Sequence, residues 1–228
     1  MSESFPEKRS SGKAIADFLQ RADSLPARAE PRGQRLIFAL DATASRQPTW
    51  DQARELHGEM FEASKALTGL EVQLCYYRGL GEFYASPWGR NPGQLHDQMA
   101  SVRCRGGYTQ IGALLTHALG ENRQSPVRAV IFIGDAVEES VDHLCALAGE
   151  CGLRQLPLFI FQEGSAPDVA AVFRRLAKLS GGAYAKFDSG SARQLADLLR
   201  AVATYVSGGV DALRKLPDNA ARHLLEQL

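Results

Sequence analysis

The chain of 228 residues lacks several features that would place it at once in a common functional class. No apolar run approaches the roughly 18 residues that a membrane-spanning helix needs. Lysine plus arginine and aspartate plus glutamate both number 26, so no excess of either sign favours nucleic acid or an anionic membrane as the main partner. Residues 1–13 are polar and lack the basic-then-apolar pattern of a signal peptide. We therefore expect a cytoplasmic protein.

Sequence signatures of nucleotide binding and of nucleophilic catalysis are also missing. There is no P-loop, no GxGxxG and no GxSxG motif. The five histidines show no metal-binding spacing, and the four cysteines form no CxxC pair. We interpret the cysteines as reduced thiols of the core or of loops, as is typical of cytosolic proteins. These absences disfavour a zinc site and leave no conventional catalytic motif.

What the sequence does contain is a regular alternation of short apolar runs and amphipathic segments. The central apolar runs are continuous rather than alternating, which is typical of parallel strands buried on both faces. The pattern predicts an α/β fold: a doubly wound, mainly parallel six-stranded sheet with helices on both faces and one short antiparallel edge strand. The expected strands are 35–40, 70–77, 82–85 (the edge strand), 128–135, 156–161 and 182–187, and the expected helices are 50–67, 93–102, 111–120, 138–149, 165–179 and 191–206.

Three parts of the chain can be distinguished by composition. Residues 1–34 are interpreted as a disordered start, a short helix over 11–21 and a linker with two prolines. Residues 35–206 form the predicted α/β domain. Residues 207–228 form a C-terminal helical tail that follows the Gly208-Gly209 pair and is interrupted at Pro217.

Oxygen-bearing side chains gather where the predicted central strands end. Asp41, Thr43 and Ser45 follow the first strand, Asp135 closes the strand over 128–135, and Thr109 lies in a glycine-flanked loop before a helix. Loops that leave parallel strands open on one edge of the sheet, which is where such folds bind ligands. Two carboxylates and three hydroxyls, without histidine or cysteine, favour Mg²⁺ or Mn²⁺. A divalent cation would also offset the repulsion between the two aspartates.

The residues DATAS at 41–45, the threonine after GGY and the aspartate that ends an apolar strand resemble the metal-ion-dependent adhesion site (MIDAS) of von Willebrand factor type A (VWA) domains. The resemblance covers roughly residues 35–206 and implies a Rossmann-like VWA fold. It also implies that Thr43 and Ser45 bind the metal directly. Thr109 would bind directly or through water, and Asp41 and Asp135 mostly through water. The sixth ligand would be an acidic residue of a partner protein.

Several neighbouring residues allow more than one interpretation. Thr43 stands where the family usually has serine, and Gly134 and Ala136 flank Asp135 where the family has a hydroxyl residue and glycine. The guanidinium of Arg46 could compete for the anion position. Three acidic residues lie just beyond Asp135: Glu138, Glu139 and Asp142. We expect their negative charges to interact favourably with the dipole of a helix that begins there, although they could also make the rim of the site more negative.

Three functions follow from these patterns. The first is a non-enzymatic binding module that grips a partner's carboxylate through Mg²⁺, as an adaptor or subunit of an intracellular assembly; the role in assemblies is what the resemblance implies. The second is a Mg²⁺-dependent phosphatase similar to haloacid dehalogenases, which Thr43 disfavours because a general acid is missing there. The third is a metal-independent scaffold that binds partners through its terminal helices, for example through Phe18 or Leu213.

Overall fold

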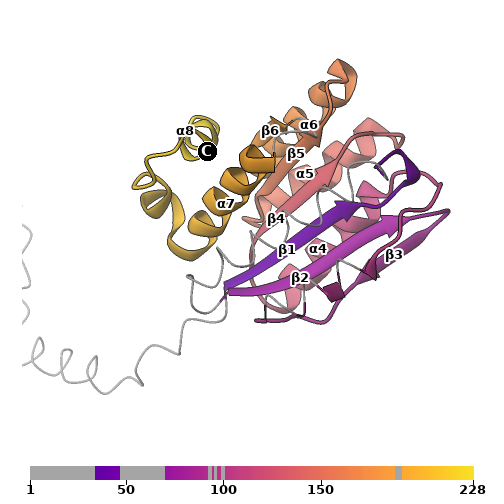
Figure 1. Cartoon of the computed structure of the whole chain (residues 1–228), viewed down its shortest axis with the longest axis horizontal. Coiled ribbons are helices and arrows are strands. Elements are labelled where there is room, and N and C mark those ends of the chain that lie inside the picture. The colour runs from indigo at the N-terminus through magenta and orange to yellow at the C-terminus, as the bar shows by residue number, and fades with distance from the viewer. Residues whose placement is uncertain (1–33, 47–69, 92–93, 95–96, 99–100, 188–191) are drawn as a thin grey trace, which may run out of the picture. The chain divides into compact units, whose positions relative to one another are not determined.

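A six-stranded sheet forms the centre of the protein, and helices cover both of its faces (Figure 1). Its strands lie in the order β3-β2-β1-β4-β5-β6, and every neighbouring pair is parallel except β2 and β3. This arrangement confirms the predicted doubly wound sheet with an antiparallel edge strand. The strands are β1 (Gln34–Asp41), β2 (Leu70–Arg78), β3 (Glu82–Ala85), β4 (Val127–Gly134), β5 (Leu158–Glu163) and β6 (Tyr184–Phe187).

The computed structural model describes residues 34–46, 70–91, 94, 97–98, 101–187 and 192–228. The helices expected over 11–21 and 50–67 lie outside these residues, as does the linker over 25–33. Of the helix expected over 93–102, the described residues 94, 97, 98 and 101 are helical, and Val102 is not. None of the helices in the described part of the chain has the length and apolar character needed to cross a membrane.

The side chains of β1 divide the core into two layers because successive strand residues point to opposite faces. One layer lies beneath α4 (Ile111–Gln124), α5 (Val141–Leu153) and α6 (Pro167–Ser180), and the other beneath α7 (Ala192–Leu213) and α8 (Asn219–Leu225). Ile37 and Ala39 pack in the first layer, and Leu36 and Phe38 pack in the second. All four side chains are buried, so β1 is enclosed on both faces as its continuous apolar run predicts.

Two helices continue past the glycines expected to end them. Helix α4 passes Gly120 and ends at Gln124, because the packing of its apolar face outweighs the roughly 1 kcal/mol that a glycine costs a helix. Helix α7 contains Gly209 in a left-handed conformation (φ 67°, ψ −163°), which kinks the chain and lets helical turns resume up to Leu213. As a result, Leu213 and Leu224 are buried in the same core as the sheet.

The starts of two other helices also differ from expectation. Helix α5 begins at Val141 rather than at 138, so Glu138 and Glu139 lie in the loop before it. Helix α6 begins at Pro167 rather than at 165, with Ala166 at its N-cap and no side-chain cap. Strands β5 and β6 each begin two residues later than predicted, because the residues before them form the close turns that lead out of α5 and α6.

Candidate metal centre

Strands β1 and β4 are neighbours, so the chain segments that follow them leave the same edge of the sheet side by side. Leu40 pairs with Ile133, which places Asp41 and Asp135 at the ends of adjacent strands. The strand order also reverses here, because β2 follows β1 on one side and β4 lies on the other. This is the topological switch point at which open α/β sheets bind ligands.

The side chain of Asp41 is fully buried and held by two donors. Its Oδ1 accepts a hydrogen bond of 2.7 Å from the backbone N–H of Thr43, and its Oδ2 accepts one of 3.0 Å from the hydroxyl of Tyr77 on β2. The hydroxyls of Thr43 and Ser45 lie 3.1 Å apart. Ser45 belongs to a short 3-10 turn over Ala44–Arg46, and Thr43 directly precedes that turn. The carboxylate therefore fixes the turn that brings the two hydroxyls together.

The loop that carries Thr109 lies against this turn and against the β2–β3 hairpin. The N–H of Arg105 donates to the carbonyl oxygen of Ala42 at 3.0 Å, and the N–H of Tyr108 donates to that of Gly79 at 3.3 Å. The approach is so close that a Cβ on Gly107 would lie 1.9 Å from the Gly79 carbonyl oxygen. Glycine at 107 is therefore required for the loop to pack in this position.

Glu138 joins the Thr109 loop to the loop of Asp135 by two hydrogen bonds. The N–H of Glu138 donates to the hydroxyl of Thr109 at 3.0 Å, and the N–H of Thr109 donates to Oε2 of Glu138 at 2.9 Å. Thr109 is buried, whereas Glu138 is exposed. These bonds fix the Thr109 hydroxyl beside the segment that carries Asp135.

Glu139 interacts with the start of α4, not with α5. Its carboxylate accepts hydrogen bonds from the N–H groups of Ile111 and Gly112, the latter at 2.9 Å. Neither a side-chain cap nor an acidic residue of its own occupies the first turn of α4, so Glu139 supplies the negative charge that this helix end favours. The prediction that Glu138 and Glu139 would favour the dipole of the helix following them is wrong, because both stand before α5. Glu138 bonds to Thr109, and Glu139 bonds to the start of α4.

Asp135 provides the test of whether these residues suit a cation. Its Oδ1 is buried and has no hydrogen-bond partner among the residues that the structure describes. A buried carboxylate oxygen without a donor is costly, and a nearby cation removes that cost. No three His, Cys, Asp or Glu side chains cluster as a metal site in the described part of the chain, so a cation here needs the hydroxyls as ligands. The oxygen-only set of Asp41, Thr43, Ser45, Thr109 and Asp135 suits a hard divalent ion.

The unusual residue before Asp135 has a local explanation. A Cβ on Gly134 would lie 2.6 Å from the ring of Phe132, whose side chain packs edge-on against Phe173 of α6. The aromatic core beneath the strand end therefore selects glycine at 134, and the backbone of β4 continues in register up to this residue. The side chain of Arg46, the expected competitor, lies outside the described residues.

Sequence reasoning missed Tyr77, and it named Glu138 and Glu139 without predicting their hydrogen bonds to Thr109 and to the start of α4. Tyr77 lies within an apolar strand and gives no sign that its hydroxyl reaches Asp41. His117 of α4 is half-buried, and its Nε2 lies 2.8 Å from Oε1 of Gln73. Burial lowers the pKa of this imidazole, although the carboxylate of Glu121 partly opposes the shift.

Large side chains on the loops near the site differ in their exposure. Tyr108 is 65% exposed directly before Thr109, and Leu80 of the adjoining hairpin is 80% exposed. Trp88 instead donates from Nε1 to Glu121 at 2.7 Å, and Trp50 lies outside the described residues. The four cysteines are free, and burial raises the pKa of Cys151 to about 12, so this thiol stays protonated near neutral pH.

Comparison with solved structures identifies the fold. An aerotolerance-related membrane protein of Bacteroides fragilis is 19% identical and matches with a TM-score of 0.56 over 73% of this chain and 98% of its own. The SpRpn10 VWA domain is 12% identical and matches with a TM-score of 0.56 over 72% and 93%. The chain therefore has the VWA-domain fold.

A third structure with this fold contains a metal. Proximal thread matrix protein 1 from the mussel byssus, solved with zinc in its MIDAS motif, is 12% identical and has a TM-score of 0.53. The match covers 74% of this chain and 45% of the mussel protein. No protein-family model matches the sequence, and a search of curated proteins finds no match.

Proposed function

We propose that this protein is a metal-dependent protein-binding module. A Mg²⁺ or Mn²⁺ ion would be held by the hydroxyls of Thr43, Ser45 and Thr109, with Asp41 and Asp135 acting mostly through water. The observation that carries the proposal is the buried Oδ1 of Asp135, which has no partner among the described residues at the edge where the hydroxyls gather. When bound, the ion supplies a coordination position that a partner's carboxylate can fill.

The electrostatics of the edge support a cation. Asp41 is fully buried, and Asp135 stands at the end of the next strand. Tyr77 and the Thr43 N–H donate to Asp41, and both of these donors are neutral. Two carboxylates at adjacent strand ends repel each other, and a divalent cation between them reverses the sign of that interaction.

The surroundings of the site suit a protein partner. Tyr108 and Leu80 expose large apolar surface on the loops that adjoin Thr109. Exposed aromatic and aliphatic side chains beside a polar centre are typical of protein interfaces. The mussel protein supports the metal, because a protein of the same fold holds zinc in its MIDAS motif. The intracellular adaptor or subunit role is part of this proposal.

The two alternatives receive no support from the described residues. The phosphatase alternative needs Asp41 as an accessible nucleophile, yet its side chain is fully buried and both oxygens accept hydrogen bonds. The scaffold alternative offers Leu213 as a contact residue, yet Leu213 is fully buried in the core, and Phe18 lies outside the described residues.

The first test is thermal unfolding of EDTA-treated protein as Mg²⁺ or Mn²⁺ is added. With a dissociation constant near ~1 mM and ~10 mM metal, binding stabilises the fold by about 1.4 kcal/mol. That free energy corresponds to a rise in Tm of roughly 3–6 °C for a domain of this size. We expect Ser45→Ala to lose the rise and Ser140→Ala, an exposed serine before α5, to keep it.

Asp135→Asn separates the metal site from a purely structural role of the same residue. The substitution removes a buried charge, so it should raise the Tm in EDTA while abolishing the response to metal. If wild type and variants respond alike to Mg²⁺, the metal site is refuted. If metal binds, the partner can be tested with pairs of peptides that are identical except that one carries Glu where the other carries Gln. Binding that requires both the Glu and Mg²⁺ supports the proposal.

A further inference from the structure

The second candidate surface is the outer edge of β6, at the opposite end of the strand order from β3. Strand β5 pairs with β6 on one side, where the N–H of Ile160 donates to the carbonyl oxygen of Ala183 at 2.9 Å. Backbone groups alternate in direction along a strand, so those of Tyr184 and Lys186 point away from β5. These backbone groups form the outer edge of β6, where no further strand of the described residues pairs with the sheet.

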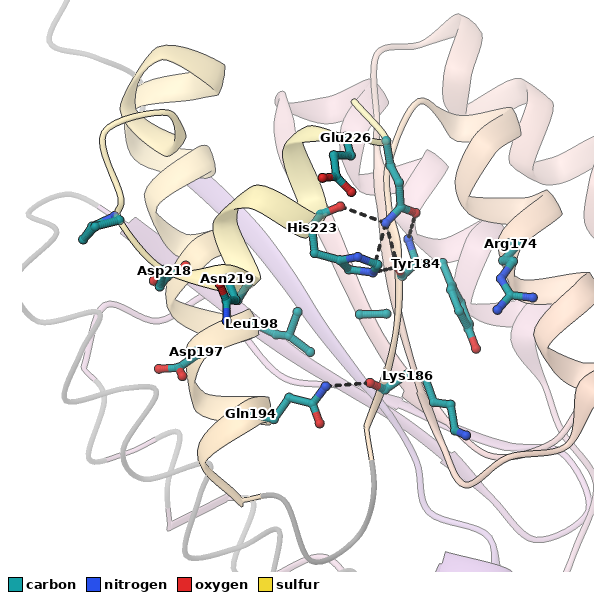
Figure 2. A pocket seen from close by; sticks show the side chains of 14 residues that line it. Arg174, Tyr184, Lys186, Gln194, Asp197, Leu198, Asp218, Asn219, His223 and Glu226 are labelled. Carbon is teal, nitrogen blue, oxygen red and sulfur yellow. Dashed lines mark hydrogen bonds between the residues drawn. The ribbon is translucent and has the colours of Figure 1, made fainter.

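Side-chain amides of two glutamines take the place of a next strand along this edge. The N–H of Tyr184 donates to Oε1 of Gln227 at 2.9 Å, and Nε2 of Gln227 donates back to the carbonyl oxygen of Tyr184 at 3.0 Å. Nε2 of Gln194 on α7 donates to the carbonyl oxygen of Lys186 at 3.1 Å. Figure 2 shows Gln194 reaching the strand from α7, and Gln227 follows the end of α8 at Leu225. Gln227 thus satisfies Tyr184 as the peptide group of a neighbouring strand would.

The hydrogen bonds that cover the β6 edge come from a few exposed side chains. Gln227 and Gln194 are both exposed, whereas Tyr184 beneath them is buried. His223 adds one contact, since its Nε2 lies 3.0 Å from the same Tyr184 carbonyl oxygen. Water competes with exposed side-chain amides, so each of these bonds is weak and easily exchanged. An incoming peptide group can make the same two bonds to Tyr184.

A pocket of about 1150 Å³ lies between β6, α7 and α8, next to the covered edge (Figure 2). Its volume is comparable to that of pockets that bind small molecules or short peptide segments. Leu198 and Pro217 contribute apolar surface to its lining. The pocket therefore offers room for an extended segment directly beside the groups that Gln227 and Gln194 now satisfy.

The charges of the pocket walls are unevenly matched. Arg174 and Lys186 project from the side of α6 and β6, and neither forms an ion pair with a carboxylate among the described residues (Figure 2). The guanidinium of Arg174 stacks over the ring of Tyr184 at 4.8 Å. On the opposite wall, Asp197 is paired with Arg200 and Asp218 caps α8, so Glu226 is the remaining carboxylate among the described lining residues against these two cations. Two cations beside an open strand edge favour an acidic segment over a neutral or basic one.

We propose that the β6 edge is a peptide-binding groove that takes an acidic, extended segment of a partner protein as a seventh strand. The amide of Gln227 occupies the position of that strand in the free protein, and the segment displaces it to pair with Tyr184. Arg174 and Lys186 select carboxylates on the incoming strand. This mode of binding is β-augmentation, in which backbone bonds give affinity and flanking side chains give selectivity. It does not depend on the metal centre.

The test uses the full chain and an end-blocked, fluorescein-labelled peptide, Thr-Val-Glu-Val-Glu-Val-Thr. Matched peptides carry Lys for Glu, or Pro for the central Val. We expect only the acidic peptide without proline to bind, because proline removes a backbone donor. Gln227→Ala should bind it about fivefold more tightly, since one intramolecular competitor is lost. Gln124→Ala, at an exposed glutamine of α4, should leave the affinity unchanged.

Two further measurements place the peptide on the strand. Lys186→Glu should weaken the acidic peptide about fivefold and favour the Lys peptide. In hydrogen exchange, the amide of Tyr184 should exchange faster in Gln227→Ala than in wild type, and the bound peptide should restore its protection. If Gln227→Ala is poorly folded, Gln227→Ser replaces it, because that variant also removes the side-chain amide and keeps a polar side chain.

Several results would overturn the proposal. Equal binding of the acidic and Lys peptides would remove the role of the two cations. Tight binding that leaves the Tyr184 amide unprotected in Gln227→Ala would show that the peptide lies elsewhere. Self-association of Gln227→Ala without peptide, measured by sedimentation, would assign the edge to a second copy of the chain instead.

Discussion

The carboxyl edge of the sheet and the outer edge of β6 both present polar groups that need partners, but the protein satisfies them differently. At the carboxyl edge, three loops interlock through backbone contacts and hydrogen bonds to carboxylates, as at Gly107 against Gly79 and at Glu138 against Thr109. At the β6 edge, exposed glutamine amides cover the backbone of one strand.

The difference indicates what each region is suited to do. Interlocked loops cannot move separately, so they hold their oxygens in fixed positions, as an ion with defined coordination requires. Exposed amides exchange readily, so they protect an edge strand from unwanted pairing and can still be displaced. We therefore expect substitutions at the first region to be costly and those at the second to be mild.

The largest effect should come from Gly107→Ala. The new Cβ would overlap the carbonyl oxygen of Gly79, and backbone atoms on both sides prevent relief by a side-chain rotation. We expect a loss of about 3 kcal/mol in the free energy of unfolding, together with loss of the metal response, because the Thr109 loop is displaced. Urea denaturation followed by circular dichroism measures the first quantity.

Gly106→Ala is the matched control for that substitution. No atom lies within 4 Å of the position that its Cβ would take, so the change should stay within about 0.5 kcal/mol. Equal destabilisation by the two variants would mean that the loop is sensitive to any side chain, and the interlocking contact with Gly79 would lose its significance.

An intermediate effect is expected for Glu139→Ala. The substitution leaves the N–H groups of Ile111 and Gly112 without their acceptor at the start of α4. We expect a loss of about 1–2 kcal/mol, against less than about 1 kcal/mol for Gln227→Ala at the β6 edge. Glu150→Ala, which removes an exposed i,i+4 pair with Arg154, serves as the control and should cost less than about 0.5 kcal/mol. If Gln227→Ala proves the costlier of the two, the contrast between the edges fails.

The smallest effect concerns pH and His117. Burial holds the pKa of this imidazole below its unfolded value near 6.5, so the native state binds fewer protons than the unfolded state. Stability from this residue is therefore complete at neutral pH and is lost as the pH falls through 6.5 toward the lower native pKa. Between pH 7.5 and 5.5, His117→Gln should lose less Tm than wild type, by up to about 3 °C. Identical slopes would contradict the prediction.

Much of the fold could be predicted because its signals are local. The continuous apolar run of 36–40 indicates a strand covered on both faces, and the few residues between β2 and β3 permit only an antiparallel pair. The oxygen side chains at 41, 43, 45, 109 and 135 could be assigned to one edge for the same reason, since parallel strands end together. Whether they bind a metal stays a prediction.

Other features are absent from any local pattern because they join distant residues. Glu138 meets Thr109 across 29 residues, Tyr77 meets Asp41 across 36, and Gln227 meets Tyr184 across 43. The sequence by itself determined the succession of strands and helices along the chain, because apolar periodicity and turn residues are patterns of only a few neighbouring positions. Only the tertiary structure decided which polar groups lock the carboxyl edge and which cover β6, because long-range packing, and not local preference, brings these partners within hydrogen-bond distance.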